Sequence, residues 1–341
     1  MSEIGVAAEA IPRAAQDFLV DAGLAPGDDV PVWTPLTGGV SSELWHVRID
    51  DTELVVKGAL AKLKVAGDWR APTSRNAVEW DWLVYAHDVA PGGVPVPLAH
   101  DGGRGLFAMS FLAPEKHPVW KAQLMAGTVR RGDAAAVGDL VGRLHARSSN
   151  DDTAESRFRT DDNFHVLRIE PYLLATARRH PDLTEHLEDI VAVTMSTHHA
   201  LVHGDVSPKN ILIGPSGPVL LDAECAWYGD PAFDIAFVLT HLVLKAVIRP
   251  AHEAELRASG HALLKAYGPH VSWERLHDVL ARGGRLLPAL LLARIDGTSP
   301  VEYLDPAQQE RVRSVARALL GGASMTIDDV LDEAFTRLRN D

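Results

Sequence analysis

Residues 203 to 210 of the chain read His203-Gly204-Asp205-Val206-Ser207-Pro208-Lys209-Asn210, and an apolar run, Ile211-Leu212-Ile213, follows them directly. An Asp and an Asn five positions apart can lie on one short loop, where the carboxylate meets a substrate hydroxyl and the amide oxygen turns toward a metal ion. A His-Gly-Asp triplet alone is usually an ordinary turn, but the added Asn favours a catalytic loop. His203 itself is expected to be structural, with its ring hydrogen-bonded to fix the loop. The spacing therefore indicates phosphoryl transfer.

The residues after this loop predict a β-hairpin that ends in a second carboxylate. The run 211–213 has the composition of a buried strand, and Gly214-Pro215-Ser216-Gly217-Pro218 carries the signals of a turn. Residues 218–221 return as the partner strand and bring Asp222 to its end. Together with Asn210, this carboxylate offers hard oxygen ligands on neighbouring elements, which suit Mg²⁺ in a metal-nucleotide complex.

This combination resembles the motif of the aminoglycoside phosphotransferase and choline kinase group of small-molecule kinases, which are related in fold to protein kinases. The family pattern is His-Gly-Asp, four residues, Asn, and then a strand that ends in Asp-x-Glu or Asp-x-Asp. The chain carries this pattern in full, with Asp222-Ala223-Glu224 at the strand end. The segment from Tyr228 to Ala236 is similar to the family's helix-starting segment after the metal-binding Asp.

The resemblance implies an α+β, protein-kinase-like fold of two lobes. A small N-terminal lobe with an antiparallel sheet, residues 1–110, would bind the nucleotide, and a large, mainly helical lobe, residues 111–341, would hold the catalytic loop and the acceptor pocket. Asp205 would be the catalytic residue, and Asn210 and Asp222 would hold Mg²⁺. ATP would donate the phosphate, and a small molecule with a hydroxyl would accept it.

Several residues of the first lobe are expected to contact the nucleotide. Strands are predicted at 43–49 and 53–57, and Lys57 stands where kinases place the cation that pairs with the α- and β-phosphates. A lysine on an edge strand is the alternative interpretation. A Gly-Gly turn before this hairpin would let the backbone approach phosphate oxygens, and nearby serines can donate hydrogen bonds to them. These candidates are Gly38, Gly39, Ser41 and Ser42.

A phosphate-binding lysine needs a carboxylate to hold it. A predicted helix offers Glu79, which the family pattern implies as the partner, whereas Asp81 lies two positions further on and points to a different face. The last strand of the lobe is expected to run into a hinge. There the resemblance implies that the carbonyl of Ser110 and the amide of Leu112 receive the adenine edge.

The rest of the chain is mostly predicted as helix. A helix over 11–24 would pack on the outside of the first lobe, and a helix over 134–145 has an apolar stripe typical of core packing. The helix over 183–201 is expected to lead directly into the catalytic loop. Four further helices are predicted beyond Asp234, at residues 235–248, 253–267, 273–293 and 306–320.

The composition bounds the class of protein. The chain has 341 residues, of which 46% are hydrophobic, and a formal net charge of −13. We therefore expect a large core and no binding of nucleic acid, which needs clustered Lys and Arg. An acidic surface could favour a cationic acceptor, although solubility alone explains it.

The remaining bounds come from cysteine usage and from segment hydrophobicity. The single cysteine, Cys225, excludes an intramolecular disulfide and is interpreted as a packing residue. Neither a membrane span nor a signal peptide is recognised, so a cytoplasmic protein is expected. A monomer or homodimer is also expected.

The acceptor is the least determined part of the prediction. Residues 55–60 and 164–172 resemble the methylthioribose kinase branch of the family, whereas residues 206–210 have the form found in the antibiotic kinases. The paired arginines that hold the sugar in methylthioribose kinases have no match, and Arg285 and Arg294 are merely nearby.

Four residues beyond the metal-binding carboxylate lie where an acceptor could be contacted: Glu224, Trp227, Tyr228 and Asp230. The two aromatic residues are equally explained as core residues. A sugar, aminosugar or aminoglycoside is the preferred acceptor class, with methylthioribose, and choline or another amino alcohol, as alternatives. A nucleotide-binding pseudokinase is the non-enzyme alternative, although no metal ligand or catalytic Asp is lost. A protein kinase would need a longer activation segment.

Overall fold

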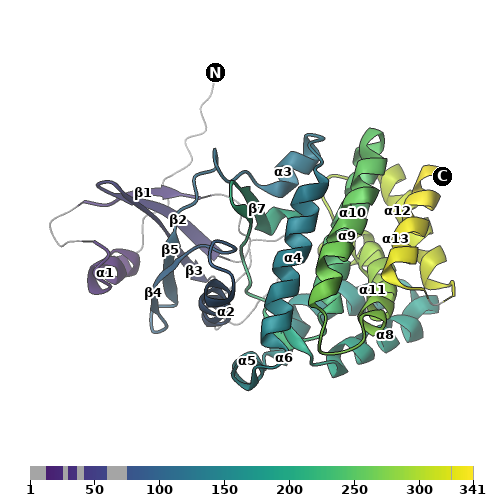
Figure 1. Cartoon of the computed structure of the whole chain (residues 1–341), viewed down its shortest axis with the longest axis horizontal. Coiled ribbons are helices and arrows are strands. Elements are labelled where there is room, and N and C mark those ends of the chain that lie inside the picture. The colour runs from purple at the N-terminus through teal and green to yellow at the C-terminus, as the bar shows by residue number, and fades with distance from the viewer. Residues whose placement is uncertain (1–12, 26–29, 37–41, 60–74, 324, 341) are drawn as a thin grey trace. The chain divides into compact units, whose positions relative to one another are not determined.

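The computed structural model describes residues 13–25, 30–36, 42–59, 75–323 and 325–340. The chain divides into two compact units (Figure 1). Unit 1 comprises Met1–Trp80 and Val96–Phe111, and unit 2 comprises Asp81–Pro95 and Leu112–Asp341.

Unit 1 is built on a five-stranded antiparallel sheet with the order β1-β2-β3-β5-β4. The strands are β1 (Val32–Pro35), β2 (Ser42–Ile49), β3 (Thr52–Ala59), β4 (Pro97–Asp101) and β5 (Leu106–Ser110). The two strands predicted at 43–49 and 53–57 are confirmed as β2 and β3, and Ile49 pairs with Thr52 across a tight turn.

One face of this sheet forms the core of unit 1. Burial alternates along β2, where Trp45, Val47 and Ile49 are buried, as expected for a strand with one covered face. Helix α1 (Arg13–Asp21) contributes Ala15, Phe18 and Leu19 to the same cluster, at helical spacing. A helix is therefore confirmed within the range predicted over 11–24, but it ends at Asp21, and residues 22–25 form a turn.

Unit 2 is mainly helical. Its helices are the C-terminal part of α2 (Arg75–Val89), α3 (Trp120–Met125), α4 (Arg131–Ser148), α5 (Asp152–Arg157), α6 (Asp161–Phe164), a π-helix (His165–Leu174), α7 (Ala175–Arg179), α8 (Thr184–Ser196), α9 (Ala232–Ile248), α10 (Glu253–Tyr267), α11 (Leu276–Asp296), α12 (Pro306–Leu320) and α13 (Ile327–Asn340). Helix α9 is buried on all sides from Ala232 to Val247, and it packs against α10, α11 and α13 (Figure 1).

Two short antiparallel pairs position the predicted catalytic loop in unit 2. Strand β6 (Ala200–Val202) pairs with β9 (Trp227–Gly229), and β7 (Ile211–Gly214) pairs with β8 (Gly217–Leu220). The loop 203–210 connects β6 to β7, and its last three residues form a 3₁₀ turn. The hairpin predicted from 211 to 221 is therefore confirmed.

The prediction of a helix over 183–201 is wrong at its C-terminal end. Helix α8 ends at Ser196, and residues 200–202 form strand β6. The apolar residues of β6 are buried and pair with β9, so long-range pairing overrides the local helical pattern. Helices 253–267 and 306–320 begin and end where they were predicted. Among the helices that the structure describes, none combines the length and apolarity needed to cross a bilayer.

Close packing of α4 on α10 gives a test of this architecture. In Gly138→Ala, the new Cβ would lie 2.3 Å from the carbonyl oxygen of Leu263, a backbone atom that cannot yield unless α10 moves. We expect the free energy of unfolding, measured in urea, to fall by about 1–3 kcal/mol, as in other overpacked cores. Gly132→Ala on the same helix is the matched control, since its Cβ would meet nothing within 4 Å. It should gain up to about 1 kcal/mol from helix propensity. Similar effects of the two substitutions would contradict the close approach.

Candidate active site

The loop that begins at His203 is built around a glycine that no other residue can replace without strain. Gly204 has φ of +77°, which is a left-handed conformation that disfavours side chains. A Cβ at this position would also lie 2.7 Å from the carbonyl oxygen of Cys225. The conformation and the close approach together explain the Gly of the His-Gly-Asp motif.

The carboxylate of Asp234, in the first turn of α9, holds the start of this loop. It accepts hydrogen bonds from the backbone N–H groups of His203 and Gly204, both at 2.8 Å. The ring of His145 lies 3.2 Å from the same carboxylate, and its other nitrogen lies 3.0 Å from the hydroxyl of Tyr267. Asp234 was recognised only as part of a family-like segment, and its role as the anchor of the loop was not predicted.

The ring of His203 has the structural role that was expected of it. Its Nδ1 accepts a hydrogen bond from the backbone N–H of Asp205 at 3.1 Å, and its Nε2 donates to the carbonyl of Leu221 at 3.1 Å. Burial lowers the pKa of the imidazole, which keeps it neutral and able to make both bonds. His203 therefore ties the loop to the end of the β7–β8 hairpin.

Asp205 is a buried carboxylate between two cations. Its Oδ2 lies 2.8 Å from Nη2 of Arg168, on the π-helix, and 3.1 Å from Nζ of Lys209. Burial opposes the charge, but Lys209 and Arg168 outweigh it and hold the pKa of the carboxyl below its usual range. Arg168 also donates to the carbonyl of Gly204 at 2.5 Å. Asp205 is therefore a fixed, ionised acceptor of hydrogen bonds.

Asn210 and Asp222 lie at the same end of the β7–β8 hairpin. The backbone N–H of Leu221 donates to the carbonyl of Asn210 at 2.9 Å, and Asp222 follows with φ of +67°. The side-chain Nδ2 of Asn210 donates to the carbonyl of Asp205 at 3.2 Å, which fixes the orientation of the amide. An amide oxygen and a carboxylate are hard ligands, so this donor set fits Mg²⁺. The structure describes no group of three or more His, Cys, Asp or Glu residues with metal-ligand geometry in the parts that it covers.

The ion pair predicted between Lys57 and Glu79 is present in unit 1. Lys57 Nζ lies 2.7 Å from Glu79 Oε1, and both side chains are buried. Lys57 is on β3, opposite Leu44 and Phe107, and Glu79 is on α2. Asp81, the other candidate, forms an ion pair with Arg157 in unit 2 instead.

The structure describes some of the other candidate nucleotide-binding residues but not all of them. Ser42 is the buried first residue of β2, whereas Gly38, Gly39 and Ser41 lie outside the described residues. Ser110 ends β5, where its hydroxyl accepts a hydrogen bond from the N–H of Val96 at 2.9 Å. Leu112 follows two residues later, as the first residue of the second part of unit 2. Their contacts with a nucleotide stay predictions.

Two of the four acceptor candidates are packed into the core of unit 2. Trp227 is fully buried, its ring stacks on Phe164 with centroids 4.4 Å apart, and its Nε1 donates to Asp161 at 3.0 Å. Tyr228 is also buried. Both positions agree with the alternative interpretation as core aromatics, and contact with an acceptor stays a prediction.

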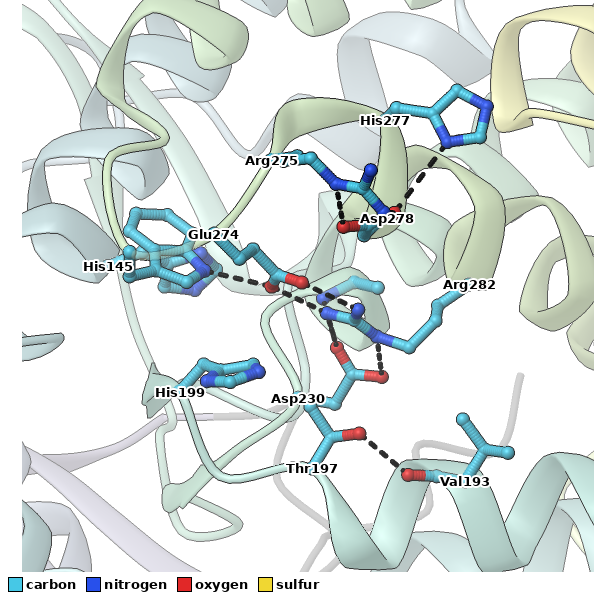
Figure 2. Close-up of polar contacts among 12 residues, drawn as sticks. His145, Val193, Thr197, His199, Asp230, Glu274, Arg275, His277, Asp278 and Arg282 are labelled. Atoms are coloured by element: carbon cyan, nitrogen blue, oxygen red, sulfur yellow. Dashed lines mark hydrogen bonds and ion pairs between the residues drawn. The ribbon is translucent and has the colours of Figure 1, made fainter.

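The third candidate, Asp230, is fully buried in an ionic network at the start of α9 (Figure 2). Its oxygens lie 3.0 and 3.1 Å from Nε and Nη2 of Arg282, and Glu274 binds the same guanidinium with two contacts of 2.7 Å. The backbone N–H of Ala232 also donates to Asp230 at 3.0 Å. This geometry gives Asp230 a structural role, and the prediction that it contacts an acceptor has no support from these contacts.

The last candidate, Glu224, and its neighbour Cys225 lie on the segment between Asp222 and β9. Glu224 is nearly buried, and its backbone carbonyl accepts a hydrogen bond from Asn163 at 2.8 Å. Burial raises the pKa of the Cys225 thiol well above its ordinary value, which keeps it protonated and agrees with a packing role.

Sequence reasoning missed the residues that surround Asp205. Lys209 is inside the motif, four residues after Asp205, and that spacing could have suggested its ion pair. Arg168 is 37 positions away in sequence, and no local pattern marks it. The π-helix that carries Arg168 contains Pro171 and was not predicted either.

Comparison with models of protein families shows which family the chain belongs to. The model of the phosphotransferase enzyme family matches residues 32–260. The chain belongs to this family.

The relatives are distant and longer than the matched region. Methylthioribose kinase 1 from Oryza sativa subsp. japonica is 23% identical over 237 residues, which are 61% of this chain and 55% of the relative. A methylthioribose kinase from Erwinia tasmaniensis is 25% identical over 245 residues, or 60% of this chain and 58% of the relative. The chain therefore spans little more than half the length of these relatives.

Two solved structures confirm the expected fold class. A choline kinase from Cryptosporidium parvum has a TM-score of 0.53 at 12% identity, over 96% of this chain and 94% of the other. A choline/ethanolamine kinase family protein from Mesorhizobium loti has a TM-score of 0.51 at 16% identity, over 96% and 100%. At these identities the likeness shows the α+β, protein-kinase-like fold alone.

The buried ion pair of unit 1 gives a second test. Glu79→Gln is expected to lower the free energy of unfolding by about 3 kcal/mol, because it leaves a buried ammonium without its carboxylate. The double variant Lys57→Met/Glu79→Gln should lose clearly less than the sum of the single losses. Urea unfolding of all three measures the coupling. Glu53→Gln, at an exposed position of β3, the strand that carries Lys57, is the control. Its free energy of unfolding should stay within about 0.5 kcal/mol of the parent value. Additive losses would show that the pair is not coupled.

Proposed function

We propose that this protein is an ATP-dependent small-molecule kinase, which transfers the γ-phosphate of ATP to a hydroxyl of a small acceptor such as a sugar. The observation that carries the proposal is the buried carboxylate of Asp205, held by Arg168 and Lys209 on a loop that Asp234 anchors. Membership of the phosphotransferase family supports the reaction class. The similarity to methylthioribose and choline kinases supports a small hydroxyl compound as acceptor.

In this proposal, Asp205 positions the acceptor. Its carboxylate would accept a hydrogen bond from the acceptor hydroxyl and hold that oxygen in line with the γ-phosphate. Since Lys209 and Arg168 lower the pKa of Asp205, the carboxylate is a weak base. Proton transfer to Asp205 is therefore expected late, after the hydroxyl has begun to bond to phosphorus and its proton has become acidic.

The nucleotide contacts that we propose are those that the family resemblance implies. Lys57, fixed by Glu79, would pair with the α- and β-phosphates, and Asn210 and Asp222 would hold Mg²⁺, which neutralises charge on the phosphate groups. The remaining nucleotide contacts proposed are Gly38, Gly39, Ser41 and Ser42 with the phosphates and Ser110 and Leu112 with adenine. A cytoplasmic monomer or homodimer stays the expectation for the state of the protein.

Substitution of the catalytic carboxylate tests the proposal directly. Asp205→Asn should lower kcat for phosphate transfer by about 10²–10⁴-fold, because the amide cannot take the proton, while the Kd for Mg-ATP changes little. ADP release with a panel of sugars, aminoglycosides and amino alcohols gives the rate, and calorimetry gives the Kd. Asp152→Asn, an exposed Asp on α5, is the matched control and should keep full activity. An unchanged rate in Asp205→Asn would remove Asp205 from this role. Binding of Mg-ATP without turnover on any alcohol would favour the pseudokinase alternative.

Arg168 is expected to act as a positioning residue for Asp205. Arg168→Ala should lower kcat by about 10–100-fold, because the carboxylate and the Gly204 carbonyl lose a fixed donor, while the KM for ATP stays similar. Added guanidinium at millimolar concentration should restore part of the rate, since it can supply the missing donors. Arg178→Ala, an exposed arginine, is the control. Loss of activity without guanidinium rescue, together with lowered stability, would show a merely structural role.

A further inference from the structure

Unit 2 contains a buried cation that the proposed phosphate chemistry does not use. Lys245, on α9, is 1% exposed, and its Nζ lies 3.7 Å from the centroid of the Tyr303 ring. Within the described residues, its ammonium has neither a hydrogen bond nor a carboxylate at ion-pair distance. The ring face of Tyr303 attracts a desolvated cation, but this attraction is smaller than the cost of removing an ammonium from water. The contacts around Lys245 therefore leave its charge incompletely compensated.

Two more unpaired donors come from the neighbouring segments. Arg294, on α11, donates through Nη1 to Ser299 and to the Tyr172 hydroxyl at 3.2 Å, but no carboxylate of the described residues pairs with it. The Nε of Arg294 and the hydroxyl of Tyr303 are both buried and have no hydrogen-bond partner in the part of the chain that the structure describes. Buried donors without acceptors are rare in native proteins and call for a partner.

The charges of the neighbouring side chains act on Lys245. Burial lowers the pKa of Lys245 to about 7, with Lys121 and Arg294 adding to the effect and Glu302 opposing it. Glu302 is exposed and already pairs with Lys121 at 2.5 Å. Positive charge therefore exceeds negative charge around Lys245, and an added anion would relieve the excess.

This cluster is connected to Asp205 along one face of α9. Phe237, His241 and Lys245 are four residues apart and share that face, which spans about 12 Å at 1.5 Å per residue. At one end, the guanidinium of Arg168, which pairs with Asp205, lies 5.9 Å from the Phe237 ring centroid. At the other end stands Lys245.

A second connection runs through Tyr172. The Cζ atoms of Arg168 and Arg294 both lie 5.7 Å from the centroid of the Tyr172 ring. Burial lowers the pKa of His241, the positive charges of Arg294 and Lys245 lower it further, and Asp205 opposes them. His241 therefore lies within electrostatic reach of both Asp205 and the cation cluster.

We propose that the acceptor carries an anionic group, a carboxylate, phosphate or sulfate, which binds Lys245 and Arg294 while the reacting hydroxyl lies at Asp205. This inference rests on the proposed kinase function. It differs from the expectation that the overall acidity favours a cationic acceptor. Charges beyond about 8–10 Å are screened in physiological salt, so the side chains next to the acceptor decide its charge, and the net charge of the chain does not.

Anion binding tests the site without catalysis. Inorganic sulfate is titrated into the full chain by calorimetry with Mg-ADP present to occupy the nucleotide site. We expect one saturable sulfate site, whose affinity falls at least 10-fold in Lys245→Met and in Arg294→Gln. Lys265→Met, an exposed lysine on α10, is the matched control and should bind sulfate as the parent does. Retained sulfate binding in Lys245→Met, with its fold verified by circular dichroism, would overturn the inference.

Phosphate transfer to matched acceptors tests the substrate class. Glucuronate, glucose and glucosamine differ in charge at similar size, and a sugar phosphate and a sugar sulfate extend the set to the other anions. We expect kcat/KM to be highest for an anionic member and to fall at least 10-fold in Lys245→Met, through KM, but not in Lys265→Met. Preference for glucosamine or glucose, unaffected by Lys245→Met, would overturn the inference and leave the kinase function standing. Sulfate binding at Lys245 without transfer to any acceptor would instead contradict the kinase function.

Discussion

The bonds from the backbone of His203 and Gly204 to the carboxylate of Asp234 are the constraint on which the geometry of the loop 203–210 depends. Charge-assisted hydrogen bonds to a buried carboxylate are about twice as strong as neutral ones. They join a loop, which on its own would be mobile, to α9, the most completely buried helix of the unit. Because Asp205 is the next residue, its backbone inherits this rigidity, and only its side chain remains to be fixed.

That side chain is fixed by charge. Arg168 and Lys209 both reach the same oxygen of Asp205, so the ionised form is favoured despite burial. A reactive base would need the opposite arrangement, with a raised pKa. A low pKa suits a reaction whose acceptor hydroxyl becomes acidic only as it bonds to phosphorus. In the proposed mechanism, Asp205 would therefore position the hydroxyl first and take its proton late.

The fold and the local part of the site could be predicted because their signals are local. Asp205, Asn210 and Asp222 lie within 18 positions, and the glycine and proline residues of segment 214–218 mark the turn between β7 and β8. Strand β6 was assigned to a helix because its partner, β9, begins 25 positions after β6 ends and no pattern within the segment reports that pairing. Local periodicity decides an element only where no long-range contact competes.

The electrostatic surroundings of the site could not be predicted for the same reason. Arg168 and Asp205 come together from separate elements, as do Lys245 and Tyr303. The Lys57–Glu79 pair was found only because a family resemblance supplied the long-range information that spacing lacks. Sequence thus indicated the reaction, whereas the charge that the acceptor meets emerges only from the folded chain.

The partly buried guanidinium of Arg282, also in unit 2, is compensated by carboxylates. Asp230 and Glu274 enclose the guanidinium of Arg282, which donates two hydrogen bonds to each of these carboxylates (Figure 2). Lys245 and Arg294 form no such network among the described residues, although both stand on helices that pack together.

An uncompensated cation near an acceptor discriminates by repulsion as well as by attraction. A cationic acceptor placed beside Lys245 and Arg294 would bring like charges together in a poorly hydrated region, where the interaction is stronger than in water. An anionic acceptor would instead supply a negative charge to pair with Lys245 and Arg294. Specificity is a difference between two affinities, and a charge that penalises the wrong ligand enlarges this difference even when the right ligand gains little. Under the proposed anion site, the same two side chains would therefore favour anionic acceptors and disfavour cationic ones.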